Sequence, residues 1–326
     1  MFGLNVVIFT FVVVFANAQV GPLTAHFQDW LASNGFAPYK FARLDLGNTG
    51  SYGGKNSSAD TVKYRPVIFI HGNSDGALAI PGLYSSGWTN TISYFESKGY
   101  TSAELYVTTW GDRKAADAHL NTHSCALIQH LRAFVDAVMG YTGATLIDVI
   151  THSMGVTLGR KIVRGGILED PKAPGFGCDV GPSLIANVNT FIGISGGNYG
   201  MCTCSLDDEH IFPTCNSMNG FWPGDSCESN GICGDYPLPS RCLKGVKYSE
   251  FLTDLNSKRD IEGNYVYSIM SMEDDILMNH GMVWGRPTAI IPGSTQIKIF
   301  QNYTHMHTKE LTADIQYAMV TYQNVF

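Results

Sequence analysis

A serine at a sharp turn is the first candidate for chemistry in this chain. The residues Thr-His-Ser-Met-Gly at 151–155 lie between an apolar run at 146–150 and a stretch at 156–164 that is predicted to be helical. A strand that turns abruptly into a helix, with a serine at the bend and small residues beside it, holds the hydroxyl in a strained, exposed position. The helix N-terminus behind it favours developing negative charge. This pattern predicts that Ser153 is a nucleophile.

A second serine motif matches the common G-x-S-x-G spelling more fully but has a different context. It occupies 193–197, with Ser195 at its centre, and it follows an apolar run at 188–194. No helical stretch comes after it, so neither a forced elbow nor a helix dipole is expected there. We therefore interpret Ser195 as a residue at the carboxyl end of a central strand, at the rim of the crevice where open α/β sheets bind ligands.

A serine hydroxyl needs a base to take its proton and an acid to orient that base. In folds with this elbow the acid follows a later strand. The apolar run at 264–269 leads into three adjacent carboxylates, of which we favour Asp274, with Glu273 and Asp275 as alternatives. The competing interpretation is a solvated acidic turn in which one carboxylate caps a short helix at 276–279.

The base is expected in the loop after the last strand, which is predicted at 295–300. Two histidines, His305 and His307, follow that strand. His305 comes first and is the favoured base, and His307 is the alternative. The competing interpretation is that these are two unrelated surface histidines. This is less expected for both residues at once, because the loop occupies the position in the chain order where the catalytic histidine belongs.

An ester carbonyl under attack becomes an oxyanion, which needs preorganised N–H donors. The backbone N–H of Met154, directly after the nucleophile, is one expected donor. The other is expected in the loop after an early strand, and Ile-His-Gly-Asn at 70–73 is such a loop. Glycine lets the backbone approach the substrate closely, so we assign the second donor to the N–H of Asn73.

Apolar runs and helical stretches alternate along the chain, which predicts a mostly parallel sheet covered by helices on both faces, an α/β fold. Strands are predicted at 66–70, 104–108, 146–150, 188–194, 264–269 and 295–300. Helices are predicted at 23–34, 88–98, 115–139, 156–164 and 311–322.

The first eighteen residues have the pattern of a secretory signal, with an apolar core at 6–15 and Ala-Asn-Ala at 16–18 as the cleavage site. The apolar core is too short to span a bilayer, so we expect a secreted protein without a transmembrane anchor, with residues 19–326 forming one domain. The net charge of the 326 residues is −7 and no Lys/Arg cluster stands out, so a nucleic-acid partner is not expected.

Eight cysteines in an exported chain predict disulfides, with no pairing deducible from the sequence. They are Cys125, Cys178, Cys202, Cys204, Cys215, Cys227, Cys233 and Cys242. Six lie in a Gly- and Pro-rich segment, an insertion at about 200–245 that cross-links must order. A zinc site at Cys202 and Cys204 is the alternative. Asn56 and Asn302 begin sequons and are candidate glycan sites.

Several of these segments together resemble the lipase class 2 family, and in particular its enlarged secreted nematode branch. The matching pieces are the run at 67–73, the elbow at 151–155, the acidic run and its apolar continuation at 271–279, and the tail at 305–312. The family's elbow commonly reads Ala-His-Ser-Met-Gly, so Thr151 is a departure. The resemblance places the catalytic aspartate at Asp274 and the histidine at His305.

The resemblance implies an α/β-hydrolase fold and a serine hydrolase that acts on carboxylic esters of lipids, without metal or organic cofactor. It places the insertion where many such enzymes carry a lid, which would shape access to the site or binding at a lipid–water interface. The residues by themselves indicate only acyl transfer to water. Two alternatives stay open: a soluble carboxylesterase, and an inactive secreted protein that binds lipid or another partner.

Overall fold

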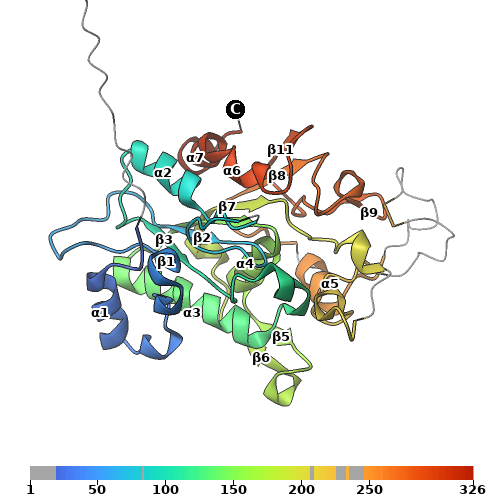
Figure 1. The fold of residues 1–326 in the computed structure, drawn as a ribbon, viewed down its shortest axis with the longest axis horizontal. Coiled ribbons are helices and arrows are strands. Elements are labelled where there is room, and N and C mark those ends of the chain that lie inside the picture. Colours follow the sequence, from blue (N-terminus) through green and yellow to red (C-terminus); the bar gives the residue numbers. More distant parts are fainter. Residues whose placement is uncertain are drawn as a thin grey trace, which may run out of the picture.

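A seven-stranded, mostly parallel sheet lies at the centre of the molecule (Figure 1). In spatial order its strands are β1 (Ser51–Tyr52), β3 (Leu105–Thr108), β2 (Val67–Ile70), β4 (Ile147–His152), β7 (Val188–Ile194), β8 (Tyr265–Ser271) and β11 (Gln296–Phe300). β1 pairs antiparallel with β3, and the other neighbours are parallel. The predicted α/β class is confirmed, and within this sheet only the short edge strand β1 was not expected.

The computed structural model describes most of the chain. The described residues are 20–325 apart from 83, 206–208, 225–232, 235–245 and 258. The predicted signal segment at 1–18 lies outside them, as do Cys227 and Cys242. In the described part, no helix is both long enough and apolar enough to span a membrane.

Helices cover both faces of the sheet (Figure 1). Successive side chains of a strand point to opposite faces, so each strand packs in two separate cores. Ile68 and Ile70 of β2 pack in the core that includes α1 (Ala25–Ser33), α3 (Cys125–Thr142) and α4 (Met154–Arg164). Val67 and Phe69 pack in the core that includes α2 (Thr89–Ser97) and α7 (Ala313–Tyr322). The strand is buried throughout, which is typical of parallel sheets covered on both sides.

The long helix predicted at 115–139 is wrong in its first half. Residues Ala115–Leu120 form a separate 3₁₀ helix, η3, and α3 begins at Cys125. The hydroxyl of Ser124 accepts the N–H of Leu127 and so caps α3. The N–H of His123 donates to the carbonyl of Asn219, in the insertion. The N–H of His123 thus bonds a distant segment, whereas in a continuous helix it would bond a carbonyl within the helix.

The remaining elements are short and lie outside the central sheet. They are the helices α5 (Glu250–Ser257) and α6 (His307–Glu310), the strand pairs β5–β6 (Ile167–Glu169, Gly177–Asp179) and β9–β10 (Met282–Val283, Arg286–Pro287), and the 3₁₀ helices η1 (Ala37–Tyr39), η2 (Leu44–Thr49), η4 (Pro174–Phe176), η5 (Ile185–Asn187), η6 (Cys202–Ser205), η7 (Pro213–Cys215) and η9 (Asn279–Gly281).

Three disulfides cross-link the described part of the chain, which confirms the expectation of disulfides. Cys125–Cys178 joins the start of α3 to β6, whereas Cys202–Cys233 and Cys204–Cys215 lie within the insertion. Because Cys202 and Cys204 are both in disulfides, neither thiol is available to a metal ion, and the zinc alternative is wrong for this pair. The side chains of both sequon residues, Asn56 and Asn302, are exposed.

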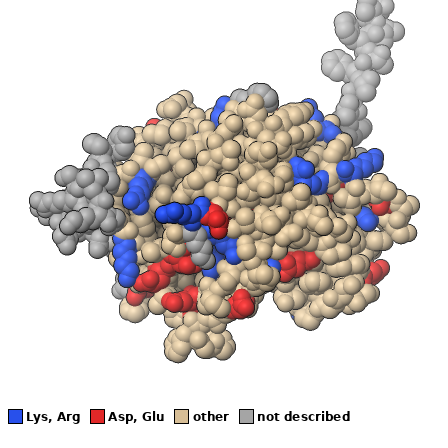
Figure 2. Space-filling model, turned by 180° about the vertical axis from the view of Figure 1, so that it is seen from behind, with Lys and Arg blue, Asp and Glu red and all other residues tan. Residues whose placement is uncertain are grey.

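Charged side chains are scattered over the face shown in Figure 2. Basic and acidic residues are interspersed there with uncharged ones, and no continuous basic band crosses the described surface on that side.

A buried charge cluster ties α4 to the segment that precedes β8. Oε1 of Glu262 accepts from Nε of Arg160 and from Nε of Arg164, both at 2.8 Å, and the three side chains are at most 3% exposed. Nη1 of Arg160 also donates to the side-chain oxygens of Asn198 and Asn256. The cluster therefore fixes the helix behind Ser153 against two distant segments.

The Glu262→Gln variant is expected to be less stable by about 3 kcal/mol, because two buried guanidinium groups lose their counter-charge. Denaturant unfolding followed by circular dichroism measures the difference. The matched control is Asp136→Asn, which removes a half-exposed partner of Arg132 and is expected to cost less than about 1 kcal/mol. Equal unfolding midpoints for Glu262→Gln and the parent would contradict a stabilising role for the cluster.

Candidate active site

Ser153 stands at a tight bend between β4 and α4. Its backbone has φ 55° and ψ −129°, a left-handed conformation that costs a non-glycine residue roughly 1–3 kcal/mol. Its N–H donates to the carbonyl of Ile194 on β7, which holds the bend against the sheet. A Cβ at Gly155 would lie 2.4 Å from the carbonyl oxygen of Ile70, so only glycine fits there.

Thr151, where related elbows carry a smaller residue, is accommodated by two local features. Its hydroxyl donates to the carbonyl of Ile192 at 2.7 Å, so the buried oxygen is satisfied. Its methyl group faces Gly159 of α4, where an added Cβ would lie 2.8 Å away. The helix can pass over the threonine because it presents a glycine at that turn.

His305 and Asp274 form a buried pair at the carboxyl edge of the sheet. Nδ1 of His305 lies 2.9 Å from Oδ1 and 2.8 Å from Oδ2 of Asp274. Burial alone would raise the pKa of the Asp274 carboxyl, but the hydrogen bond and charge of His305 and the N–H groups of Leu277 and Ile276 outweigh it, so the pKa lies below its ordinary value. The carboxylate therefore stays ionised and holds the proton of His305 on Nδ1.

The other ring nitrogen of His305, Nε2, is buried and has no hydrogen-bond partner in the described part of the chain. His305 and Ser153 line the same cavity. A buried imidazole nitrogen with a free lone pair is a group that accepts a proton from a neighbouring hydroxyl. The structure thus brings Ser153, His305 and Asp274 to one place, although they follow three different strands.

The alternative acids and base lie differently. Oδ1 of Asp275 accepts the backbone N–H of His305 at 2.8 Å, so it supports the histidine loop and not the imidazole ring. Glu273 is exposed. His307 is exposed at the first position of α6, and its ring lies 6.3 Å from that of Tyr303.

The loop after β2 approaches Ser153 from one side. A Cβ at Gly72 would lie 2.7 Å from Cβ and 3.3 Å from Oγ of Ser153. The side chain of Asn73 turns toward η3, where Nδ2 donates to the carbonyl of Ala118. In the described part, the N–H groups of Asn73 and Met154 donate to no other protein group, which leaves both available to a ligand oxygen.

His71 shapes this loop from within the core. Its Nε2 accepts the N–H of Trp110 at 3.0 Å, so Nδ1 carries the proton and donates to the carbonyl of Gly72 at 2.7 Å. The rings of His71 and Trp110 stack, and burial lowers the pKa of His71 to about 4. His71 is therefore a neutral brace, a role that the sequence motif did not reveal.

Comparison with known proteins decides the family. A family model described as Lipase (class 2) matches residues 64–318, more than three quarters of the chain. The chain belongs to the class 2 lipase family.

Solved structures agree with this fold. Lipase B of Aspergillus fumigatus is similar at a TM-score of 0.51 and 13% identity, over 83% of this chain and 56% of that one. The mature form of Bacillus licheniformis lipase BlEst2 is similar at a TM-score of 0.50 and 11% identity, over 84% of this chain and 100% of that one. The chain thus spans only about half of the Aspergillus protein, and at such identities the likeness concerns the fold.

In this member of the family, a cavity of about 320 Å³ opens at Ser153. Its lining is mostly apolar and comes from loops and from the insertion. The lining residues that were not predicted as site residues include Tyr84, Ala115, Ala118, Met201, Thr214, Phe221, Ile276, Leu277 and Met306. The contribution of the insertion to this lining could be expected only from the position of the insertion in the chain, directly after β7.

Three further contacts join the loops around the cavity. Lys309 of α6 pairs with Asp75 at 2.5 Å, with both side chains buried, so the histidine loop is tied to the loop after β2. Nε2 of His152 donates to the carbonyl of His305 at 3.1 Å. Oγ of Ser195 lies 2.9 Å from Oγ1 of Thr308 at the carboxyl end of β7. Ser195 is buried and already paired, unlike an exposed nucleophile.

The Gly72→Ala variant is expected to lose about 100-fold in kcat/KM for a small ester. The added methyl group would collide with Ser153 and push the loop away, which misplaces the N–H of Asn73. Initial rates with nitrophenyl butyrate measure this loss. As a control, Gly143→Ala at the end of α3 adds a methyl group in open space at a residue that does not line the cavity; its left-handed backbone (φ 70°) makes the variant less stable, but the rate of the folded enzyme should be unchanged. A fully active Gly72→Ala enzyme would show that the loop does not contact the reacting group.

Proposed function

We propose that this chain is a secreted serine hydrolase that cleaves carboxylic esters of lipids through Ser153, His305 and Asp274. The observation that carries the proposal is the buried contact of 2.8 Å between Nδ1 of His305 and Asp274, with the opposite ring nitrogen unpartnered in a cavity that Ser153 also lines. Membership of the class 2 lipase family supports ester hydrolysis.

In the proposed reaction, Oγ of Ser153 attacks the ester carbonyl while Nε2 of His305 takes its proton. The N–H groups of Asn73 and Met154 stabilise the oxyanion. His305 then protonates the leaving alcohol, and an acyl-enzyme remains on Ser153. Water, deprotonated by the same nitrogen, releases the acid, and Asp274 stabilises the imidazolium in both steps.

Apolar surface around the cavity supports a lipid substrate. Leu120 and Phe212 are exposed large apolar side chains, and the ring of Phe212 contacts His119, which lines the cavity. Met278 is also exposed and directly follows Leu277 of the lining. Exposed apolar side chains gathered at one place on a soluble surface mark a site of interaction with another apolar phase, so we infer action at a lipid–water interface.

Secretion is part of the proposal and rests on two features. Three disulfides cross-link the described part, which is typical of proteins from oxidising compartments. The segment at 1–18 has the pattern of a signal peptide. The same signal, together with the disulfide-rich insertion, supports placing the chain in the enlarged secreted branch of the family.

A fluorophosphonate probe tests whether the site turns over esters. We expect the folded, secreted protein to be labelled on Ser153, as located by peptide mass spectrometry, and we expect heat-denatured protein to remain unlabelled. If the folded protein takes no label on Ser153, the enzyme is excluded and the inactive binding protein becomes the better interpretation.

The lipid part of the proposal has a separate test. Rates on short- and long-chain glycerol esters are compared below and above the solubility limit of each substrate. A lipase is expected to gain rate when the insoluble phase forms. Hydrolysis limited to dissolved short-chain esters would instead make the protein a soluble carboxylesterase.

A further inference from the structure

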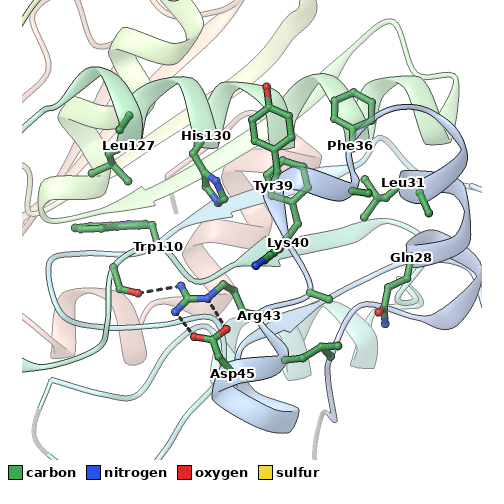
Figure 3. Close-up of a pocket in the computed structure, with 17 residues that line it drawn as sticks. Gln28, Leu31, Phe36, Tyr39, Lys40, Arg43, Asp45, Trp110, Leu127 and His130 are labelled. Carbon is green, nitrogen blue, oxygen red and sulfur yellow. Dashed lines mark hydrogen bonds and ion pairs between the residues drawn. The ribbon is translucent and has the colours of Figure 1, made fainter. Parts of the chain in front are cut away.

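A second cavity, of about 910 Å³, lies on the face of the molecule that carries α1 and α3 (Figure 3). It is an open hollow lined by the segment from α1 to η2, by α3, and by the loop after β3, which contributes Trp110. None of its lining residues also lines the cavity at Ser153. Its volume and mostly apolar lining are in the range of sites that bind small molecules.

The apolar part of this cavity has a buried floor and half-exposed sides. Phe41 and Trp110 are nearly inaccessible, whereas Phe36 and Leu127 are partly exposed. The side chain of Leu31 from α1 completes the apolar wall (Figure 3). Alkyl chains gain free energy from leaving water against such a surface.

The polar side chains that line the cavity carry a net positive charge. Nε and Nη2 of Arg43 bond the carboxylate of Asp45, and its Nη1 donates to the carbonyls of Thr109 and Gly111. Burial, aided by the charge of Arg43, lowers the pKa of His130, so this imidazole is neutral near pH 7.

Lys40 supplies the excess charge. It lies in the cavity wall, and in the described part of the chain it forms no ion pair. In Figure 3 its ammonium group and the guanidinium of Arg43 point toward the same part of the cavity. Two cations against one carboxylate, Asp45, leave one positive charge beside an apolar wall. The occupant that complements both features has a single anionic head and an alkyl tail.

We propose that this cavity binds one alkyl carboxylate, a free fatty acid, with the carboxylate at Lys40 and the tail along Trp110 and Leu127 on one side of it (Figure 3). The choice of a carboxylate rests on the proposed function, because ester hydrolysis releases this anion. The site adjoins the active-site loops through Trp110, which lines the cavity and also bonds both the ring and the carbonyl of His71.

Binding is measured by titration calorimetry with laurate below its micelle concentration, on the Ser153→Ala protein, so that the result does not depend on turnover. We expect saturable binding that weakens about fivefold in Lys40→Asn, because one partly exposed charge contact is lost. Asparagine is chosen since Lys40 has φ 53°, a conformation that asparagine tolerates. Lys40→Arg should restore the affinity, and Lys172→Ala, an exposed lysine outside the cavity, should leave it unchanged.

A second variant tests the cavity by volume. Ala126 of α3 lines it with an exposed side chain, so Ala126→Trp fills the space and should abolish laurate binding without loss of stability. Dodecanol should bind the parent more weakly than laurate and should not respond to Lys40→Asn. Three results would each overturn the proposal. They are laurate binding that survives both Lys40→Asn and Ala126→Trp, equal affinity for dodecanol and laurate, and Lys40-dependent binding to phosphatidylglycerol vesicles in place of laurate. Because the Ser153→Ala protein is used, failure here leaves ester hydrolysis untouched.

Discussion

The Ser153→Ala variant is expected to lose about 10⁵- to 10⁶-fold in kcat for nitrophenyl butyrate, with little change in fold. Removal of the nucleophile leaves only the rate acceleration from the oxyanion donors and from substrate binding. The variant should unfold at a midpoint no lower than that of the parent, because alanine removes one hydroxyl and keeps the strained backbone of the bend. Rates with purified protein, corrected for spontaneous hydrolysis, measure the loss.

The chain contains its own control for this experiment. Ser195 also lines the cavity and lies in the better-spelled motif, but its hydroxyl is paired with Thr308. We expect Ser195→Ala to keep activity within about tenfold of the parent, because it removes support from the histidine loop and not the reacting atom. Retained activity in Ser153→Ala, combined with loss in Ser195→Ala, would move the nucleophile to Ser195 and defeat the proposed mechanism.

The Asp274→Asn variant is expected to lose about 10⁴-fold in kcat. The carboxylate accepts the proton of Nδ1 of His305, whereas an amide nitrogen at that place would favour the tautomer that puts the proton on Nε2. A protonated Nε2 does not take the proton of Ser153. Fluorophosphonate labelling of Ser153 should slow in parallel with ester hydrolysis, since both need the same base.

Neighbouring residues of the same type serve as controls. Glu273→Gln changes an exposed carboxylate and should have no effect. Asp275→Asn keeps an oxygen that accepts the N–H of His305, so a loss of less than about tenfold is expected. His307→Ala should also keep most activity, while His305→Ala should not. A larger defect in Asp275→Asn than in Asp274→Asn would show that the acid has been assigned to the wrong carboxylate.

The parts of the site that could be predicted from the sequence are those that directly follow buried strands. Apolar runs marked β2, β4, β8 and β11, and the carboxyl ends of parallel strands share one edge of the sheet. For this reason Gly72, Ser153, Asp274 and His305 were expected together, and the structure places Gly72, Ser153 and His305 around one cavity, with Asp274 bonded to His305. Whether they act as proposed is for the variants above to decide.

The parts that could not be predicted depend on contacts between distant segments. Residues 115–124 have helical composition, but His123 bonds the insertion and Asn121 bonds Asn73, so no continuous helix forms. Phe221 reaches the cavity from an insertion that disulfides help to fold, and no pattern in the sequence gives their pairing. Trp110 follows a strand as an ordinary core residue would, yet it holds His71 in one tautomer.

The ion pair between Asp75 and Lys309 has a consequence for engineering substrate range. The pair joins two segments that are 234 residues apart in the sequence. It therefore holds the loop of Asn73 and the loop of His305 in a fixed position relative to each other. Widening the cleft from that side would shift the N–H of Asn73, the proposed oxyanion donor, and the imidazole of His305 at once. Libraries that aim at bulkier acyl or alcohol groups should therefore vary lining residues outside these two loops, at Met201, Thr214 and Phe221.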